Sequence, residues 1–281
     1  MYEFDPYFQI WDYDVPVKGI TREILAFHIS DLHIAHCTEN SSQADKDRVH
    51  RQKTAWEPIR LDFARRYGDS VSEEHLLDPE EGWTRTVDML NAAPCDLALF
   101  TGDMMEDYSP DNLSFLTDGL KRLSIPWMWV CGNHEKGHTD AYLEWMNGHP
   151  DFQTLSVDGL RFIGINNADK QVTSEQLEKL KKAADSGPSV LVMHIPMLTE
   201  FNRSETKVFG EYFLMGTGDV LPSTRDFLTY MQSDVNPISA VLCGHVHGRH
   251  LSEYRPGKPQ ICASSCMVGS INRIHFVPDI K

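Results

Sequence analysis

Short runs of apolar residues alternate with amphipathic stretches along most of the chain. Apolar runs with few charges are typical of β-strands that are buried on both faces of a sheet. The strands that this pattern predicts cover residues 24–30, 96–101, 127–131, 160–166, 190–194, 240–243 and 261–265.

Apolar residues at helical spacing lie between these predicted strands. They predict helices over residues 83–92, 111–123, 174–184 and 223–232. The third begins with Thr173 and has Gln176 three residues later, which is the pattern of a capping box. Strands that alternate with helices predict an α/β layered fold with crossover connections.

Two long segments interrupt the alternation. Residues 37–81 are polar and charged and include a predicted helix over 46–67, whereas residues 198–222 mix aromatic residues with charges and glycines. Loops of this length in a compact domain are generally functional or carry structure of their own. We expect one domain over residues 1–281, with both segments beside the site and 38–81 forming a helical cap. Surface elaboration without a role in substrate binding is the alternative.

Composition narrows the function. The chain has 281 residues, 41% of them hydrophobic, and a net charge of −15, which argues against non-specific nucleic-acid binding. A small phosphorylated substrate stays compatible with this charge, because bound divalent cations invert the local field. No stretch approaches the roughly 18 apolar residues of a membrane span, and the first residues do not resemble a signal peptide. The six cysteines have no C-x-x-C spacing, so we expect reduced thiols in a soluble, cytoplasmic protein.

Five segments rich in Asp, Asn and His each follow a predicted strand. They are Asp31-Leu32-His33, Gly102-Asp103, Gly132-Asn133-His134-Glu135, His194 and Gly244-His245-Val246-His247. Ligands of layered α/β folds gather beyond the carboxyl ends of strands. In extended backbone, residues i and i+2 point to the same side, so Asp31 with His33, and His245 with His247, should each offer paired ligands. Each segment alone could be a cap, a turn or a core histidine, but together they indicate two divalent cations, namely Mn, Fe or Zn.

The order and types of these segments resemble the calcineurin-like metallophosphoesterase superfamily, whose signature is D-x-H, G-D, G-N-H-[D/E], a lone H and G-H-x-H. The resemblance implies a four-layer α-β-β-α sandwich with two packed mixed sheets. Ser/Thr protein phosphatases carry G-D-x-x-D-R-G and R-G-N-H-E, and residues 102–108 and 131–135 lack both arginines. The stretch before residues 30–33 and the ending over 271–280 resemble instead the bacterial single-domain branch, which includes phosphodiesterases.

The resemblance also implies residue roles. One metal would take Asp31, His33 and His247, the second would take Asn133, His194 and His245, and Asp103 would bridge both. His134 resembles the family's histidine that is not a ligand and acts as a general acid. A carboxylate should orient this histidine, and Glu106 and Asp107 are both candidates. Arg203, Lys207 and His36 are candidates for substrate contacts.

The expected activity is metal-dependent hydrolysis of phosphate esters, with a bridging hydroxide that attacks phosphorus in line. A phosphodiester or nucleotide-type substrate is favoured because the paired arginines are missing. A phosphomonoesterase with Arg203 or Lys207 as its clamp, and a non-catalytic metal-binding scaffold, are the alternatives. A nuclease would need a basic groove; its candidate residues are Arg48, Arg51, Lys53, Arg60, Arg65 and Arg66. The natural substrate, the metals and the oligomeric state stay open.

Overall fold

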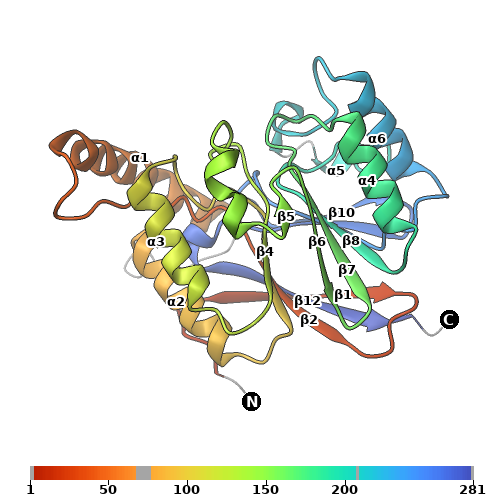
Figure 1. The fold of residues 1–281 in the computed structure, drawn as a ribbon, viewed down its shortest axis with the longest axis horizontal. Helices are drawn as coiled ribbons and strands as arrows, with labels where there is room; N and C mark the ends of the chain where they lie inside the picture. Colours follow the sequence, from red (N-terminus) through yellow and green to blue (C-terminus); the bar gives the residue numbers. More distant parts are fainter. Residues whose placement is uncertain (1–2, 68–76, 207–208, 280–281) are drawn as a thin grey trace.

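Two mixed β-sheets form the centre of the molecule (Figure 1). The structure is a computed structural model that describes residues 3–67, 77–206 and 209–279. The first sheet has the order β1-β12-β2-β3-β4, and only its β12–β2 pair is antiparallel. Its strands are β1 (Gln9–Val17), β12 (Ser270–Pro278), β2 (Ile24–Ile29), β3 (Leu97–Phe100) and β4 (Trp127–Trp129).

The second sheet has the order β10-β11-β9-β8-β7-β6-β5. The four strands from β11 to β7 are parallel, and antiparallel strands extend both edges. Its strands are β10 (His250–Arg255), β11 (Lys258–Cys262), β9 (Val241–Cys243), β8 (Ser189–Val192), β7 (Leu160–Ile165), β6 (Phe152–Val157) and β5 (Gly148–His149).

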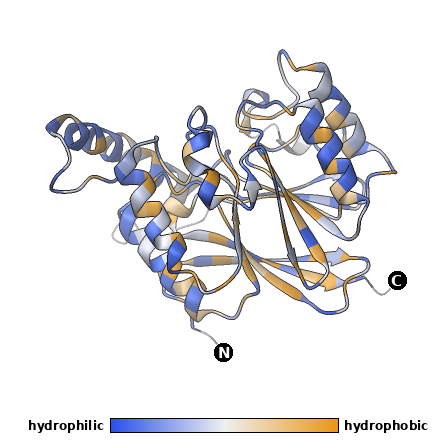
Figure 2. Ribbon diagram, viewed as in Figure 1, coloured by the Kyte–Doolittle hydropathy of each residue, from blue (hydrophilic) through white to orange (hydrophobic). Residues whose placement is uncertain are grey.

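Three apolar layers hold the elements together, and the strands are correspondingly apolar in Figure 2. The middle layer lies between the sheets and contains Leu99 and Met128 from the first and Phe162 and Val190 from the second. The outer layers lie under α2 (Pro79–Ala92) with α3 (Pro110–Lys121), and under α4 (Ser174–Ala184) with α6 (Pro222–Gln232). The order of layers is therefore α-β-β-α, which confirms the predicted fold class.

The predicted helices and buried strands are present, with ends shifted by a few residues. Thr173 caps α4 through the capping box that the sequence predicts. Strands β1, β5, β6, β10 and β12 were not predicted. β1 shows why: it mixes apolar with charged residues and contains Pro16, a pattern that suits an edge strand and weakens the strand signal. It gains its order from β12, with which it pairs along its whole length.

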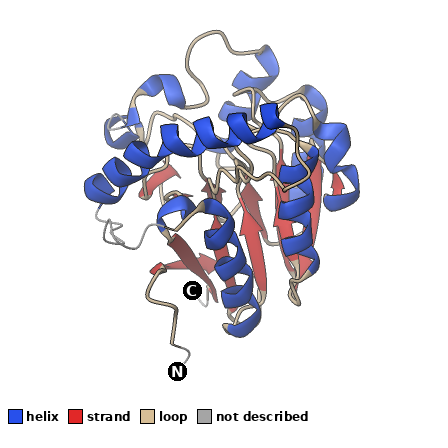
Figure 3. Cartoon of the chain, turned by 90° about the vertical axis from the view of Figure 1, so that its left-hand side faces the viewer, coloured by secondary structure: helices blue, strands red, loops and turns tan. Residues whose placement is uncertain are grey.

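The two interrupting segments carry further short elements. The first contains α1 (Gln43–Tyr67), which begins three residues before the predicted helix and runs crosswise to the strands in Figure 3. The second contains α5 (Arg203–Thr206) and η4 (Glu211–Phe213), two short helical turns. Two further short helical turns are η2 (Thr139–Trp145) and η5 (Cys266–Val268). Among the residues described, no helix is both long and apolar enough to span a membrane.

Candidate metal centre

The predicted ligands follow strand ends, but their backbone is not extended. Seven non-glycine residues have positive φ among those described, and five of them are predicted ligands, with φ from +48° to +70°: Asp31, His33, Asp103, His245 and His247. Left-handed backbone is uncommon outside glycine and is found where the surrounding structure supports strain, often at functional sites. The expectation that these side chains converge through extended i, i+2 geometry is therefore wrong, because β2 and β9 end before the ligands begin.

The first group of candidate ligands joins three of the segments. The side chains of Asp31, His33, Asp103 and His247 are buried, and their ligand atoms lie within 4.8 Å of one another. His247 Nε2 lies 3.1 Å from Asp31 Oδ1 and 3.1 Å from His33 Nε2. Two imidazole nitrogens and a carboxylate oxygen thus converge on one point.

The second group shares Asp103 with the first. Asp103, His194 and His245 again offer ligand atoms within 4.8 Å of one another. His194 Nε2 lies 3.1 Å from Asp103 Oδ2 and 3.1 Å from Asn133 Oδ1. The structure therefore brings together all seven predicted ligands, with Asp103 between the two groups.

The donor set fits divalent cations. His245 Nε2 is buried and has no hydrogen-bond partner in the structure, although its ring lies against His194. The facing Nε2 atoms of His33 and His247 can share at most one proton as a hydrogen bond. Imidazole nitrogens together with carboxylate and amide oxygens are ligands that Mn, Fe and Zn accept. A cation in each group would give these nitrogens a partner.

In His33 and His194, the second imidazole nitrogen is hydrogen-bonded by a residue that belongs to neither ligand group. His33 Nδ1 lies 2.8 Å from Glu106 Oε2, and His194 Nδ1 donates to the carbonyl oxygen of Thr101 at 2.6 Å. Such contacts fix the ring orientation and the tautomer of a metal ligand. In both residues Nε2 is the atom left to face a cation.

Two motif glycines permit the close approach of these segments. A Cβ on Gly244 would collide with Ser30 Oγ and would lie 2.6 Å from Asp31 Oδ2. A Cβ on Gly132 would collide with Asp103 Oδ1. Any side chain at either position would displace a candidate ligand.

Charge and burial set the protonation of the second group. Burial alone would lower the pKa of His194, but the charge and hydrogen bond of Asp103 raise it to about 9. Burial and the neighbouring His194 lower the pKa of His245 to about 3. In the absence of cations, the proton of this group therefore stays on His194.

His134 lies at the edge of the first group. Its ring centroid is 4.6 Å from that of His33, and its Nδ1 donates to the backbone carbonyl of Glu106 at 2.6 Å. The carboxylate of Glu106 is 3.5 Å from the same Nδ1 and closer to His33. Glu106 thus orients His134 mainly through its main chain, and its side chain serves His33.

Asp107 is not placed to orient His134, which corrects the prediction for this residue. Its carboxylate accepts two hydrogen bonds from Arg48 of α1, at 2.6 and 2.7 Å, and one from Asn112. This ion pair joins the first long segment to the loop that follows Asp103. Asp107 therefore has a structural partner that the sequence did not reveal.

The predicted substrate residues are not gathered at the two groups. Arg203 pairs with Glu211 at 2.7 Å and lines a separate surface groove that includes Thr229. His36 stacks on Phe115, with ring centroids 4.4 Å apart, and its Nδ1 lies 3.5 Å from a carboxylate oxygen of Glu80. Lys207 lies outside the described residues.

Glu135 has a role that the sequence analysis did not assign. Its buried carboxylate accepts hydrogen bonds from the backbone N–H groups of Gly132, Asp103 and Met105, at 2.7, 2.9 and 2.9 Å. Burial, followed by the charge of Asp103, raises the pKa of Glu135 to about 7. It ties together two of the ligand-bearing loops, and its place in the G-N-H-E segment was the available signal.

Asn167 and Trp56 were also missed. Asn167 Oδ1 accepts the backbone N–H groups of His194 and Ile195, at 3.0 and 3.1 Å, and so fixes the turn after β8. Trp56 on α1 has its ring centroid 4.5 Å from that of His33, and it forms a side-chain hydrogen bond with Glu106. No sequence motif includes either residue, because each is far along the chain from the candidate ligand that it contacts.

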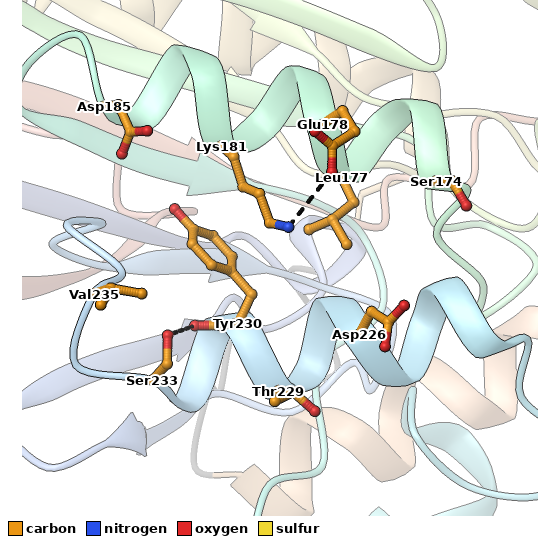
Figure 4. A pocket seen from close by; sticks show the side chains of 10 residues that line it. All are labelled: Ser174, Leu177, Glu178, Lys181, Asp185, Asp226, Thr229, Tyr230, Ser233 and Val235. Carbon is orange, nitrogen blue, oxygen red and sulfur yellow. Dashed lines mark hydrogen bonds and ion pairs between the residues drawn. The ribbon is translucent and has the colours of Figure 1, made fainter.

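A further groove lies in an outer helical layer (Figure 4). Side chains of α4 and α6 line it, among them Leu177, Lys181 and Tyr230, and its volume is about 640 Å³. None of its lining residues belongs to the two groups of candidate ligands. The chemistry-bearing residues therefore gather elsewhere.

Comparison with known proteins agrees with this geometry. The family model of calcineurin-like phosphoesterases matches residues 25–249, so the chain belongs to that family. A probable cyclic nucleotide phosphodiesterase from Synechococcus sp. is 30% identical over 143 residues, which cover 45% of this chain and 56% of that protein.

Two solved structures were compared with this chain, and the first of them supports the fold. A purple acid phosphatase from yellow lupin (Lupinus luteus) seeds has a TM-score of 0.53 at 13% identity, over 95% of this chain and 48% of that one. A dimetal phosphatase from Danio rerio has a TM-score of 0.48 at 12% identity, over 88% of this chain and 89% of that one. At these identities the likeness concerns the fold alone.

Proposed function

We propose that this protein is a binuclear metal-dependent phosphodiesterase. The observation that carries the proposal is the pair of ligand groups that meet at Asp103. Asp31, His33 and His247 would hold one divalent cation, Asn133, His194 and His245 would hold the other, and Asp103 would contact both. Such a pair supplies Lewis acidity and an activated water for attack on phosphorus.

The chain's own residues position the reaction. His134 is oriented by the Glu106 carbonyl through Nδ1, which leaves Nε2 to protonate the departing oxygen. Burial lowers the pKa of His134, but the charges of Asp103 and Glu106 more than offset this and raise it. The ring is partly exposed, so it can reach a substrate.

Diester substrates are favoured over monoesters. The segments around Asp103 and Asn133 lack the two arginines with which Ser/Thr protein phosphatases would clamp a dianionic phosphate, and Arg203 is paired with Glu211. The similarity to a probable cyclic nucleotide phosphodiesterase points the same way. A phosphomonoesterase and a non-catalytic scaffold stay as alternatives that an assay decides.

The nuclease alternative loses part of its support. Arg48 is paired with Asp107, Lys53 is paired with Glu80, and Arg60 is buried. Basic side chains that are already paired with acidic residues, or buried, bind the phosphate backbone of a nucleic acid poorly. A small phosphorylated substrate therefore fits the described surface better than nucleic acid.

Domain organisation and compartment complete the proposal. We take residues 1–281 as one domain, with the segment 38–81 as a helical cap, because the sheets share one core and α1 contacts His33 through Trp56. Residues 68–76 of this segment lie outside the described residues. We place the protein in the reducing cytoplasm. Its six cysteines are free, including Cys243 and Cys262, whose Sγ atoms lie 3.3 Å apart.

A paired assay tests the function. Chelator-stripped protein would be loaded with Mn²⁺, Fe²⁺ or Zn²⁺ singly and given bis-p-nitrophenyl phosphate or p-nitrophenyl phosphate. We expect metal-restored turnover that is faster on the diester and is lost in Asp103→Asn. Faster turnover of the monoester would favour the phosphomonoesterase. Bound metal without turnover of either ester would favour the scaffold.

A further inference from the structure

The short helix η4 carries two exposed aromatic side chains, one of which lies beside the second group of ligands. Tyr212 and Phe213 of η4 are 77% and 49% exposed, which is high for large aromatic residues. The ring centroid of Phe213 lies 6.2 Å from that of the candidate ligand His245. Exposed apolar groups next to a reactive centre are typical of ligand contacts.

An aromatic ring also stands beside the first group. The half-buried Trp56 has its ring centroid 4.5 Å from that of His33 and 5.5 Å from that of His247. α1, which carries Trp56, and α5, which precedes η4, lie on opposite sides of β4 and β5 in Figure 1. Each long segment therefore contributes one ring, and each ring contacts a different ligand group.

The ring of Phe213 is presented by an anchored segment. Lys170 Nζ lies 4.1 Å from the ring centroid of Tyr212 and donates a hydrogen bond to the Tyr212 carbonyl. Glu211 is held by Arg203 at 2.7 Å. An aromatic side chain that is positioned in this way loses little conformational entropy when a ligand covers it.

We propose that Phe213 and Trp56 are substrate-specificity residues that stack on flat organic groups of a phosphodiester, either aryl groups or nucleobases. The inference rests on the proposed function and adds the substrate class. The two substituents of a diester point away from phosphorus in different directions, and the two rings are placed to contact one substituent each. Every aryl group or base has a face on which such a ring can stack.

The kinetic test compares two esters that release the same product. kcat/KM is measured for bis-p-nitrophenyl phosphate and for ethyl p-nitrophenyl phosphate, which replaces one aryl group by ethyl. Loss of one stacking contact should lower kcat/KM about fivefold or more. Phe213→Ala should therefore lower the ratio of kcat/KM for the bis-aryl ester to kcat/KM for the ethyl ester by at least about fivefold. Phe201→Ala is the matched control, because Phe201 is a 39% exposed phenylalanine of the same segment, and it should leave the ratio unchanged.

Trp56 needs two variants because it also contacts Glu106. Trp56 and the general acid His134 both lie against His33, so Trp56 is on the side of the leaving aryl group, which the two esters share. Trp56→Leu should therefore lower kcat/KM for both esters and leave their ratio unchanged, whereas Trp56→Phe keeps an aromatic ring and should keep kcat/KM. Mn²⁺ affinity is measured in parallel by calorimetry. An equal loss of kcat/KM in both variants, with weakened Mn²⁺ binding in both, would assign Trp56 to positioning of the ligands and would overturn its part of the proposal.

The outcomes separate this inference from the function on which it rests. Turnover of both esters by the wild type, with the ratio unchanged in Phe213→Ala and kcat/KM unchanged in Trp56→Leu, would overturn the inference alone. If neither ester is hydrolysed with any metal, the phosphodiesterase proposal fails, and binding of phenylphosphonate and methylphosphonate to metal-loaded protein decides the inference. Tighter binding of phenylphosphonate that is lost in Phe213→Ala supports stacking, and equal binding of the two overturns it.

Discussion

The carboxylate of Glu135 lies against the backbone of Asp103, and its Oε2 accepts the Asp103 N–H at 2.9 Å. The same carboxylate accepts the N–H groups of Gly132 and Met105. Asp103 has left-handed backbone, with φ of +49°, and Glu135 supplies part of the support that this conformation needs. A residue without a predicted ligand role thus holds the backbone of the residue that both ligand groups share.

Glu135→Gln should therefore weaken the metal centre. The amide can accept through one atom only, so at least one buried backbone N–H loses its partner, at a cost of about 1–3 kcal/mol. We expect a lower melting temperature and Mn²⁺ affinity reduced about 10–100-fold, as for other groups that orient ligands. Thermal unfolding and calorimetric Mn²⁺ titration measure both. Wild-type values for both would show that Glu135 does not support Asp103.

The contact of Glu106 with His33 predicts a contrast between neighbouring acids. Glu106→Ala removes the carboxylate 2.8 Å from His33 Nδ1 and should lower Mn²⁺ affinity about 10–100-fold. Asp107→Ala breaks the pair with Arg48 and should leave Mn²⁺ affinity within about twofold, because this partly buried pair does not reach the ligands. Equal losses of Mn²⁺ affinity in the two variants would contradict the assignment.

Two glycine variants separate crowding from backbone strain. Gly244→Ala places a Cβ against Ser30 Oγ and Asp31 Oδ2, so we expect poor folding or loss of Mn²⁺ binding. Gly257→Ala meets open space, but its φ of +70° costs about 1–2 kcal/mol, so stability should fall while Mn²⁺ binding stays. Soluble yield, thermal unfolding and Mn²⁺ titration report these outcomes. Normal Mn²⁺ binding by Gly244→Ala would contradict the packing argument.

The raised pKa of His194 predicts pH-dependent metal binding. In metal-free protein this pKa is about 9, so the imidazole is protonated at neutral pH and must lose its proton to bind a cation. Mn²⁺ affinity should therefore rise with pH, by up to about tenfold per unit, until pH reaches about 9. Calorimetry at pH 6, 7 and 8 in buffers of different ionisation enthalpy measures affinity and proton release. Affinity independent of pH, without proton release, would contradict this protonation state.

The sequence predicted the buried strands and their helices because apolar runs and helical spacing are local signals. It also placed the candidate ligands at strand ends, where residues such as His194 and His245 now meet. The left-handed backbone of these ligands could not be predicted, because contacts such as that of Glu135 with Asp103 come from the tertiary structure. The same holds for Asp107, whose partner Arg48 lies 59 residues away.

The central claim is that two cations share Asp103, and Mn²⁺ stoichiometry tests it most directly. Chelator-stripped wild type and Asp103→Asn would be titrated with Mn²⁺, with bound ions counted and magnetic coupling followed by electron paramagnetic resonance. We predict two magnetically coupled ions per wild-type chain. In Asp103→Asn we predict that both the coupling and the turnover of bis-p-nitrophenyl phosphate are lost. A single ion per wild-type chain, or two coupled ions and full turnover in Asp103→Asn, would contradict the account.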